Sequence, residues 1–431
     1  MLVHCIVQRD FVYDSMKRIR VFYGWWIVSA AVMVGLYVGG VVVYGFTAIF
    51  DPLVREFGWS HARISFAASL RGAESGVLEP IAGRLVDRFG PRRLVFVGGL
   101  FVAGGLLLLS GTSSLAMFYG AYVLLAVGFS ACGTTVLVSG VGNWFRARLG
   151  LATGIALCGF GLGGILLPGM VALIDHYGWR VAFDILAVGA LVVILPLSLV
   201  FRHRPEQYGM QIDGLPAQSE VQGASGSGPG SVSAEPDVSV RQALRTRTFW
   251  LLAIAFTFHT GAVLTVTTHV MPYLDSIGIG RMSAGLMATG IPVLSILGRL
   301  GLGYLGDRAS RTRVTILGMG AMSLGIVCFI LVPSVGMAAL FGFLVLFGIG
   351  YGGVTALRPA LTREYFGRAH FGSIFGVVIG INAIGGIVGP PVAGWVFDTL
   401  ADYTIAWVVL AVLLAVSAFF IVTARQSRQA W

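Results

Sequence analysis

Four ionisable residues interrupt long apolar stretches of the sequence and are the residues best suited to do chemistry there. Arg71, Glu74 and Glu79 fall in one stretch, and Arg299 falls in another. Because an ionised side chain is costly to bury, its presence in such a stretch by default marks a binding site or an ion pathway. A guanidinium stays charged and can bind a carboxylate through two hydrogen bonds, whereas a desolvated carboxyl group can take up and release a proton.

Each of these charges also has a structural interpretation. Arg71 and Glu74 lie three residues apart, on one face of a helix, where a static pair tying the helix to a neighbour is as good an interpretation as proton transfer by Glu74 or Glu79. Arg299 lies eight residues before Asp307, about 12 Å from it along a helix, which is near mid-membrane if the stretch spans a bilayer. Its structural alternative is an ion pair with Glu79 or Glu74.

The elements that must position these residues are membrane helices. Of the 431 residues, 56% are hydrophobic and only 11% are charged, whereas soluble proteins carry roughly 25% charged residues. Twelve apolar runs are long enough to cross a hydrocarbon layer of about 30 Å. We expect them near residues 24–50, 62–86, 94–112, 115–142, 149–174, 181–201, 248–271, 283–306, 313–333, 337–360, 372–397 and 403–423. The expected fold is therefore an all-α membrane protein with twelve transmembrane helices.

The basic residues predict how this chain lies in the membrane. Most of the 29 Lys and Arg residues fall in the N-terminal segment, in the loops after even-numbered runs and near the C-terminus. By the positive-inside rule that side is cytoplasmic, so we expect both termini in the cytoplasm and the protein in the inner or plasma membrane. The net charge of +10 then has a topological cause and gives no support for a nucleic-acid partner. The four scattered cysteines predict neither a disulfide nor a metal site, and no cofactor is expected.

The two halves of the sequence repeat each other. Matching glycine, proline and charged residues recur first at an offset of 220 residues and, after a two-residue slip, at 222. The matched pairs are Pro52 with Pro272, Gly58 with Gly278, Gly83 with Gly303, Asp87 with Asp307, Arg88 with Arg308, Arg93 with Arg313, Gly128 with Gly348, Gly154 with Gly376, Gly163 with Gly385 and Pro168 with Pro390. Such a repeat is typical of transporters built from two pseudo-symmetric bundles.

The repeat and the composition predict five segments. Residues 1–20 form an N-terminal cytoplasmic extension, for which Met16 is an alternative start, and residues 21–201 form the first six-helix bundle. Residues 202–246 form a cytoplasmic linker, partly disordered because it is rich in Gly, Ser and Pro. Residues 247–424 form the second six-helix bundle, and 425–431 form a cytoplasmic tail.

One motif carries a resemblance to a known family. The sequence Gly83-Arg-Leu-Val-Asp87-Arg88-Phe-Gly-Pro-Arg-Arg93 is echoed by Gly303-Tyr-Leu-Gly-Asp307-Arg308. It resembles G-x-L-x-D-R-x-G-x-R-R of the major facilitator superfamily, which implies the major facilitator fold. The resemblance implies that the glycine lets two helices approach, and that the Asp and Arg form contacts that break and re-form as the halves move. The gating candidates are Gly83, Asp87, Arg88, Arg93, Asp307 and Arg308; the alternative is a purely topological basic stop after the second helix.

Three further segments narrow the resemblance to one branch. These are the block 143–161, which begins Asn143-Trp144-Phe145-Arg146, Tyr-Gly-Trp-Trp at 23–26, and Arg-Pro-Glu-Gln-Tyr-Gly at 204–209. Together they resemble the monocarboxylate porters and oxalate/formate antiporters. The resemblance implies that Arg299 binds the carboxylate of the substrate. Ser295 stands where that branch has an acidic partner, and Tyr44 where some members have a lysine, so proton coupling does not carry over directly.

Other polar residues complete the list of candidates. His259 lies midway along the seventh run, and in this superfamily helices one, four, seven and ten line the cavity. We therefore group His259 and Arg71 with Arg299, Ser295 and Tyr44 as substrate-binding candidates, and Glu74 and Glu79 as proton-coupling candidates. His269 is expected to be structural, Arg358 to reach the membrane interface or serve in gating, and Asn382 is a further candidate for the cavity wall.

The leading functional hypothesis is secondary active transport of a small organic anion, monocarboxylate-like, by alternating access of a monomer, with proton coupling or exchange. One alternative is export of an amphipathic or cationic compound that binds at Glu74 and Glu79. Another, of a different class, is a sensor or receptor that has lost transport. The sequence contains no nucleophile elbow, no H-E-x-x-H and no other reaction signature, so an enzyme is not expected.

Overall fold

A computed structural model describes residues 22–59, 61–214, 238–279 and 281–429. The side chains that it describes do not include those of Tyr44, Arg71 and Glu74, so these three candidates lie outside the described part of the molecule. The predicted extension 1–20 and most of the predicted linker also fall outside it. Every regular element among the described residues is helical.

The first half of the chain makes six helical passes. The first pass consists of α2 (Tyr23–Val38), η2 (Gly39–Tyr44) and α3 (Gly45–Phe57). The second and third passes are α4 (His61–Phe89) and α5 (Pro91–Ser110), and the fourth consists of α6 (Leu115–Ala131) and α7 (Thr134–Gly142). The last two passes consist of α8 (Leu149–Leu162), η3 (Gly163–Ile165) and α9 (Leu166–Val200). The fifth and sixth passes share α9, which turns at Gly178, where φ is 78°. Glycine is favoured at that turn because it adopts positive φ without a steric penalty.

The second half makes six more passes. Their elements are α11 (Arg247–Ser276), α12 (Arg281–Arg308), α13 (Arg311–Ile330), α15 (Met337–Phe366), α16 (Phe371–Leu400) and α17 (Thr404–Gln429). Between or beside the passes lie the short elements η4 (Pro205–Tyr208), η5 (Ile212–Gly214), α10 (Val240–Arg245) and α14 (Val332–Val335).

The prediction of twelve transmembrane helices is confirmed. Within the described ranges, ten segments are long and apolar enough to cross a membrane, and one of them, Leu149–Val200, contains both the fifth and the sixth pass. The remaining pass is α4, which carries Arg71, Glu74 and Glu79. Large apolar side chains cover the outer surface: Ile165, Trp395 and Phe419 are 69%, 66% and 65% exposed. Such exposure suits lipid-facing surface rather than water.

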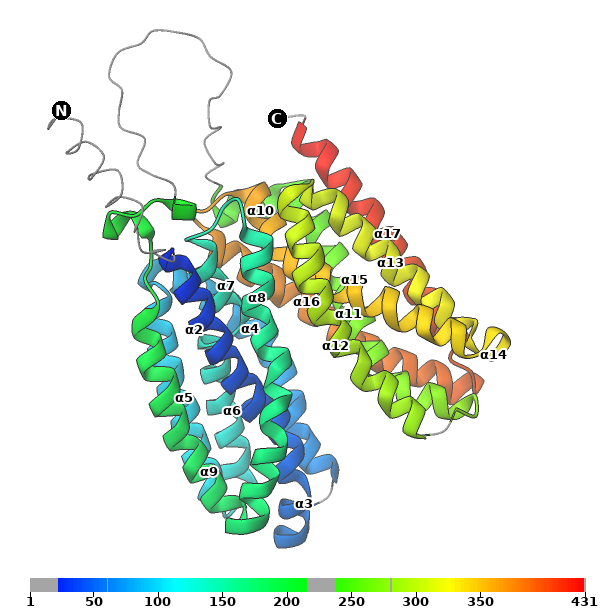
Figure 1. Ribbon diagram of the computed structural model, residues 1–431. Helices are drawn as coiled ribbons and strands as arrows, with labels where there is room; N and C mark the ends of the chain where they lie inside the picture. The colour runs from blue at the N-terminus through cyan, green and yellow to red at the C-terminus, as the bar shows by residue number, and fades with distance from the viewer. Residues whose placement is uncertain (1–21, 60, 215–237, 280, 430–431) are drawn as a thin grey trace, which may run out of the picture.

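The two six-helix halves lie side by side and meet at one end, as Figure 1 shows. Helix α4 packs against α16, and α8 packs against α12 and α15, so each contact joins one half to the other. We call this end the basic end, because Arg88, Arg92, Arg146 and Arg311 lie in or beside its loops. Toward the opposite end the two halves diverge (Figure 1).

Candidate functional site

Two aspartates join the halves at the basic end. The Asp87 carboxylate, at the end of α4, accepts hydrogen bonds from the backbone N–H groups of Gly372 (2.9 Å) and Ser373 (2.6 Å) at the start of α16. The Asp307 carboxylate, at the end of α12, accepts from Gly150 and Leu151, each at 2.8 Å, at the start of α8. We call these contacts the paired aspartate caps.

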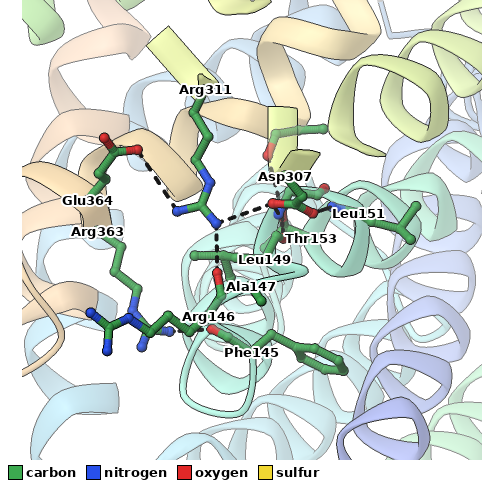
Figure 2. Close-up of polar contacts among 12 residues, drawn as sticks. Phe145, Arg146, Ala147, Leu149, Leu151, Thr153, Asp307, Arg311, Arg363 and Glu364 are labelled. Atoms are coloured by element: carbon green, nitrogen blue, oxygen red, sulfur yellow. Dashed lines mark hydrogen bonds and ion pairs between the residues drawn. The ribbon is translucent and has the colours of Figure 1, made fainter. Parts of the chain in front are cut away.

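The paired aspartate caps follow from helix chemistry. The first N–H groups of a helix have no partner within it, and the helix dipole favours a negative charge there. The same 222-residue offset found in the sequence relates Gly150 to Gly372, so the two caps are equivalents in the repeat. Figure 2 shows the cap of Asp307 with Leu151 beside it. Each cap therefore joins the last turn of a helix in one half to the first turn of a helix in the other half.

Arginines of the second half add further contacts with the first half. Arg363 donates to the carbonyl oxygens of Gly142 and, at 2.6 Å, Phe145. Arg311 donates to the Arg146 carbonyl oxygen at 2.6 Å and to Asp307 at 3.2 Å (Figure 2). These contacts satisfy carbonyl groups at the end of α7 and in the loop before α8, so they close the basic end around the caps.

Away from the basic end, Arg299 lies buried where the halves meet. Its side chain leaves α12, and its Nη1 donates at 2.6 Å to the Leu157 carbonyl oxygen of α8 in the other half. Arg299 is 6% exposed, its guanidinium carbon lies 5.8 Å from the centre of the Tyr351 ring, and its Nε has no hydrogen-bond partner. At the depth that the sequence predicts for Arg299 from its separation from Asp307, the structure has a buried charge beside the contact between the halves.

A second buried guanidinium lies on α15. Nη2 of Arg358 lies 2.9 Å from Nδ1 of His259 on α11, and 3.4 Å from the Thr260 hydroxyl. Arg358 is 8% exposed and His259 is 1% exposed. The ring of Tyr351, which Arg299 approaches from α12, has its centre 6.3 Å from that of His259. Tyr351 is therefore close to both Arg299 and the Arg358–His259 pair.

These buried groups share one chemical property. Nε of Arg299, Nε of Arg358 and Nδ2 of Asn382 are buried without a partner, and all three are hydrogen-bond donors. The Asn382 side-chain oxygen is already engaged, since it accepts from the Thr257 hydroxyl at 3.3 Å. A ligand that met any of these donors would have to accept hydrogen bonds, and beside either guanidinium it would also offset positive charge, which describes an anion.

Comparison with known proteins decides the family. The sequence model of the Major Facilitator Superfamily matches residues 26–335 and 265–430, which together span almost the whole chain. The chain belongs to the major facilitator superfamily. The resemblance drawn from the motifs is confirmed, and the chain is a multi-pass membrane transporter rather than an enzyme.

Curated relatives and solved structures agree with the superfamily. Monocarboxylate transporter 12-B of Danio rerio is 28% identical over 400 residues, covering 89% of this chain and 83% of that protein. The oxalate:formate antiporter of Oxalobacter formigenes is 26% identical over 372 residues, covering 85% of this chain and 83% of that protein. The crystal structure of the E. coli fucose:proton symporter FucP shares the fold, with a TM-score of 0.66 at 16% identity over 93% of this chain and 99% of that chain.

The gating residues expected from the superfamily motif fall into two groups. Gly83, Asp87 and Asp307 lie in the contact between the halves. Arg88 and Arg308 lie on the exposed surface of their own helices, over the rings of Phe89 (5.2 Å) and Tyr304 (4.6 Å). Arg93 is exposed and lines a lipid-facing groove with Phe89, Val97 and Phe101.

The remaining candidates are placed as follows. Glu79 is buried, at 4% exposure, and its carboxylate accepts from the hydroxyl of Thr135. Glu79 and Arg299 thus each have their own partner, and among the described side chains no ion pair joins them. The hydroxyl of Ser295 donates to the Pro292 carbonyl oxygen of its own helix at 2.7 Å.

Two expectations about single residues have clear outcomes. His269 bridges Tyr403 (3.1 Å) and the Pro390 carbonyl oxygen (2.9 Å), which are contacts that a structural residue would make. The expectation that Arg358 reaches the membrane interface is wrong, because its side chain is buried against His259. The physical reason is helix length: α15 continues to Phe366, eight residues further, so Arg358 lies about 12 Å inside the helix end.

Sequence reasoning missed the arginines that contact backbone at the basic end. Arg311 and Arg363 were read only as part of the cytoplasmic excess of basic residues, and their partners are carbonyl groups, which every residue possesses. Arg368 was also missed, although its partner is a side chain: it donates to both carboxylate oxygens of Glu206, at 2.6 and 3.2 Å. The one available signal was their position immediately before or after an apolar run.

We predict that Gly83→Leu destabilises the joined basic end by about 1–3 kcal/mol, the usual cost of overpacking. A Cβ at Gly83 would lie 2.1 Å from the Gly372 carbonyl oxygen, so α4 and α16 would have to separate. A cysteine pair at Gly76 and Ala383 reports on this contact, because their Cβ positions lie 4.0 Å apart, within the roughly 3.5–4.5 Å range of disulfides.

The measurement is the yield of that disulfide after the four native cysteines are replaced by serine. Gly83→Leu is expected to lower the yield. Gly120→Leu is the matched control, since nothing lies within 4 Å of a Cβ at Gly120. Equal yields in both variants would show that the close approach at Gly83 does not hold the halves together.

Proposed function

We propose that the chain is a secondary active transporter that moves a small organic anion, monocarboxylate-like, by alternating access. The observation that carries this proposal is Arg299: a buried guanidinium with an unpartnered Nε at the contact between the halves, and with no acidic partner among the described side chains. A buried charge of this kind is stabilised by a ligand of opposite charge.

The place of Arg299 suggests how binding and movement influence each other. Arg299 belongs to the second half, and its present acceptor, the Leu157 carbonyl oxygen, belongs to the first. A carboxylate that accepted two hydrogen bonds from the guanidinium would compete with that carbonyl oxygen. Two parallel hydrogen bonds between the guanidinium and a carboxylate are stronger than one hydrogen bond from the guanidinium to a neutral carbonyl group. Anion binding would then weaken one tie between the halves, so the two events are thermodynamically linked.

The relatives support the class of substrate. Two of them are named for monocarboxylate transport and oxalate:formate antiport, and both align over more than four fifths of this chain. We extend the anionic class, and not a particular compound, to this protein. We also propose that it acts as a monomer in the inner or plasma membrane, with the basic end and both termini in the cytoplasm, because most of its basic residues lie there.

Uptake into proteoliposomes tests the proposal. Purified protein is expected to take up radiolabelled lactate or oxalate in a saturable manner, and unlabelled carboxylates are expected to compete. A cationic dye is the control substrate, because an exporter of cationic compounds would move the dye instead. Uptake of the dye with no uptake of either carboxylate would contradict the proposal.

A further inference from the structure

The contact between Arg358 and His259 fixes the protonation of the imidazole. A guanidinium has only donors, so at 2.9 Å the Nδ1 atom of His259 must be the acceptor. The ring is then neutral, its hydrogen is on Nε2, and Nε2 is a buried donor without a partner. His259 is therefore held in the one neutral tautomer that suits Arg358.

The charged groups around His259 are all positive. On α15 it faces Arg358 and the Tyr351 ring, and on α12 Arg299 approaches that same ring. Helix α16 presents the Asn382 amide near Thr257, and its one charged residue, Asp398, lies near its far end. The described side chains of α17 that pack along α11 carry no charge, and on α11 itself the charged residues Arg247 and Asp275 lie at its two ends. No described carboxylate therefore offsets a proton on His259.

Adding a proton to Nδ1 has two costs in this setting. It removes the acceptor of the Arg358 hydrogen bond, and it places a second positive charge against the guanidinium in a poorly solvated place. An anion beside the pair would cancel both costs, because it accepts hydrogen bonds from the imidazolium and the guanidinium and supplies the missing negative charge. Proton and anion should therefore bind together rather than singly.

We propose that His259 is the proton-binding residue of the transport cycle and that it takes up its proton together with the anion, with Arg358 enforcing this order. This inference rests on the proposed function, because it needs an anion to reach the buried Arg358–His259 pair. One proton added with one monovalent anion leaves the net charge of the site unchanged, so the empty and the loaded carrier face the same electrostatic cost when the halves move.

The test measures proton uptake and transport separately. Lactate and oxalate are the probes, and calorimetry in two buffers of different ionisation enthalpy counts the protons taken up when wild-type protein binds each probe. We expect uptake of a proton with the anion, and affinity that rises as pH falls, by at most about tenfold per pH unit for one linked proton. This measurement needs no variant.

The variant is His259→Gln, whose side-chain oxygen can still accept from Arg358 but whose amide does not take up a proton. We expect it to bind the probe without proton uptake, to exchange labelled for unlabelled probe at a reduced rate that does not depend on pH, and to lose accumulation driven by an inside-alkaline pH gradient. His269→Gln is the matched control on the same helix, and it is expected to keep both activities, because His269 bridges Tyr403 and Pro390 instead.

The outcomes separate the two proposals. If wild-type protein binds or exchanges the probes without taking up a proton, the role of His259 is overturned and the proposed function stands. Accumulation by His259→Gln in response to a pH gradient would have the same two consequences. If wild-type protein neither binds nor exchanges lactate or oxalate, the proposed function fails, and the role of His259 fails with it.

Discussion

Replacing Arg299 with glutamine is expected to lower the affinity for the transported anion by at least about 30-fold and to reduce uptake to the background of empty liposomes. The reason is that truncating one partner of a buried, hydrogen-bonded charge pair costs about 2–5 kcal/mol, and about 2 kcal/mol is a factor of about 30. Arg299 donates to the Leu157 carbonyl oxygen of the other half, so its loss removes a binding group at the contact between the halves.

The conservative variant sharpens this prediction. Arg299→Lys keeps the charge but loses the planar pair of donors, so we expect affinity between those of wild type and Arg299→Gln. Arg241→Gln, an exposed arginine on α10, is the control and should bind and transport normally. Dissociation constants from calorimetry and initial uptake rates are the measurements. Wild-type affinity in Arg299→Gln would mean that Arg299 serves only to tie α12 to the Leu157 carbonyl group.

Replacing both Asp87 and Asp307 with asparagine is expected to shift the equilibrium away from the joined basic end by at least 100-fold. Each carboxylate accepts two backbone N–H hydrogen bonds at a helix start, and a hydrogen bond to a charged group contributes about 1.5–3 kcal/mol. Asparagine lacks the charge and keeps a single acceptor oxygen. Two caps weakened by about 1.5 kcal/mol each therefore account for a loss of about 3 kcal/mol.

Hydrogen exchange of the capped amides measures this shift. The N–H groups of Gly150, Leu151, Gly372 and Ser373 should exchange faster in the double variant, and each single variant should show about half of the free-energy change, because distant sites add. Asp402→Asn is the matched control: Asp402 accepts from the Thr404 N–H at 3.0 Å, also at a helix start but outside the contact. Unchanged exchange in the double variant would show that other contacts hold the basic end.

The fold could be predicted from sequence because its causes are local. A segment that crosses hydrocarbon must satisfy its backbone internally and expose apolar side chains, so hydropathy identifies each pass. The depth of Arg299 was predictable for a similar reason, since it needs only the helical rise counted from Asp307. The end of α15 was missed, although Gly367, where φ is 82°, follows Phe366 and ends that helix, so Arg358 was placed too near the interface.

The site could be predicted only in part, because its contacts depend on how helices face one another. The aspartates were identified from the repeat, but their partners are backbone N–H groups of α8 and α16, which leave no side-chain signature. The offset of 220 residues also makes Glu79 and Arg299 equivalent positions, although equivalent residues need not touch. Arg299 reaches the Leu157 carbonyl of α8, whereas Glu79 reaches Thr135 of α7.

The paired aspartate caps have a consequence for leakage across the membrane. A rigid half held at two separate points cannot turn about either point while the other holds, so we expect the basic end to open in a single event that releases both. If only one cap is broken, the other cap, which lies across the pseudo-symmetry axis, still keeps the basic end closed. Random loss of one contact then opens no path for protons, and the ion gradient that drives transport is preserved between cycles.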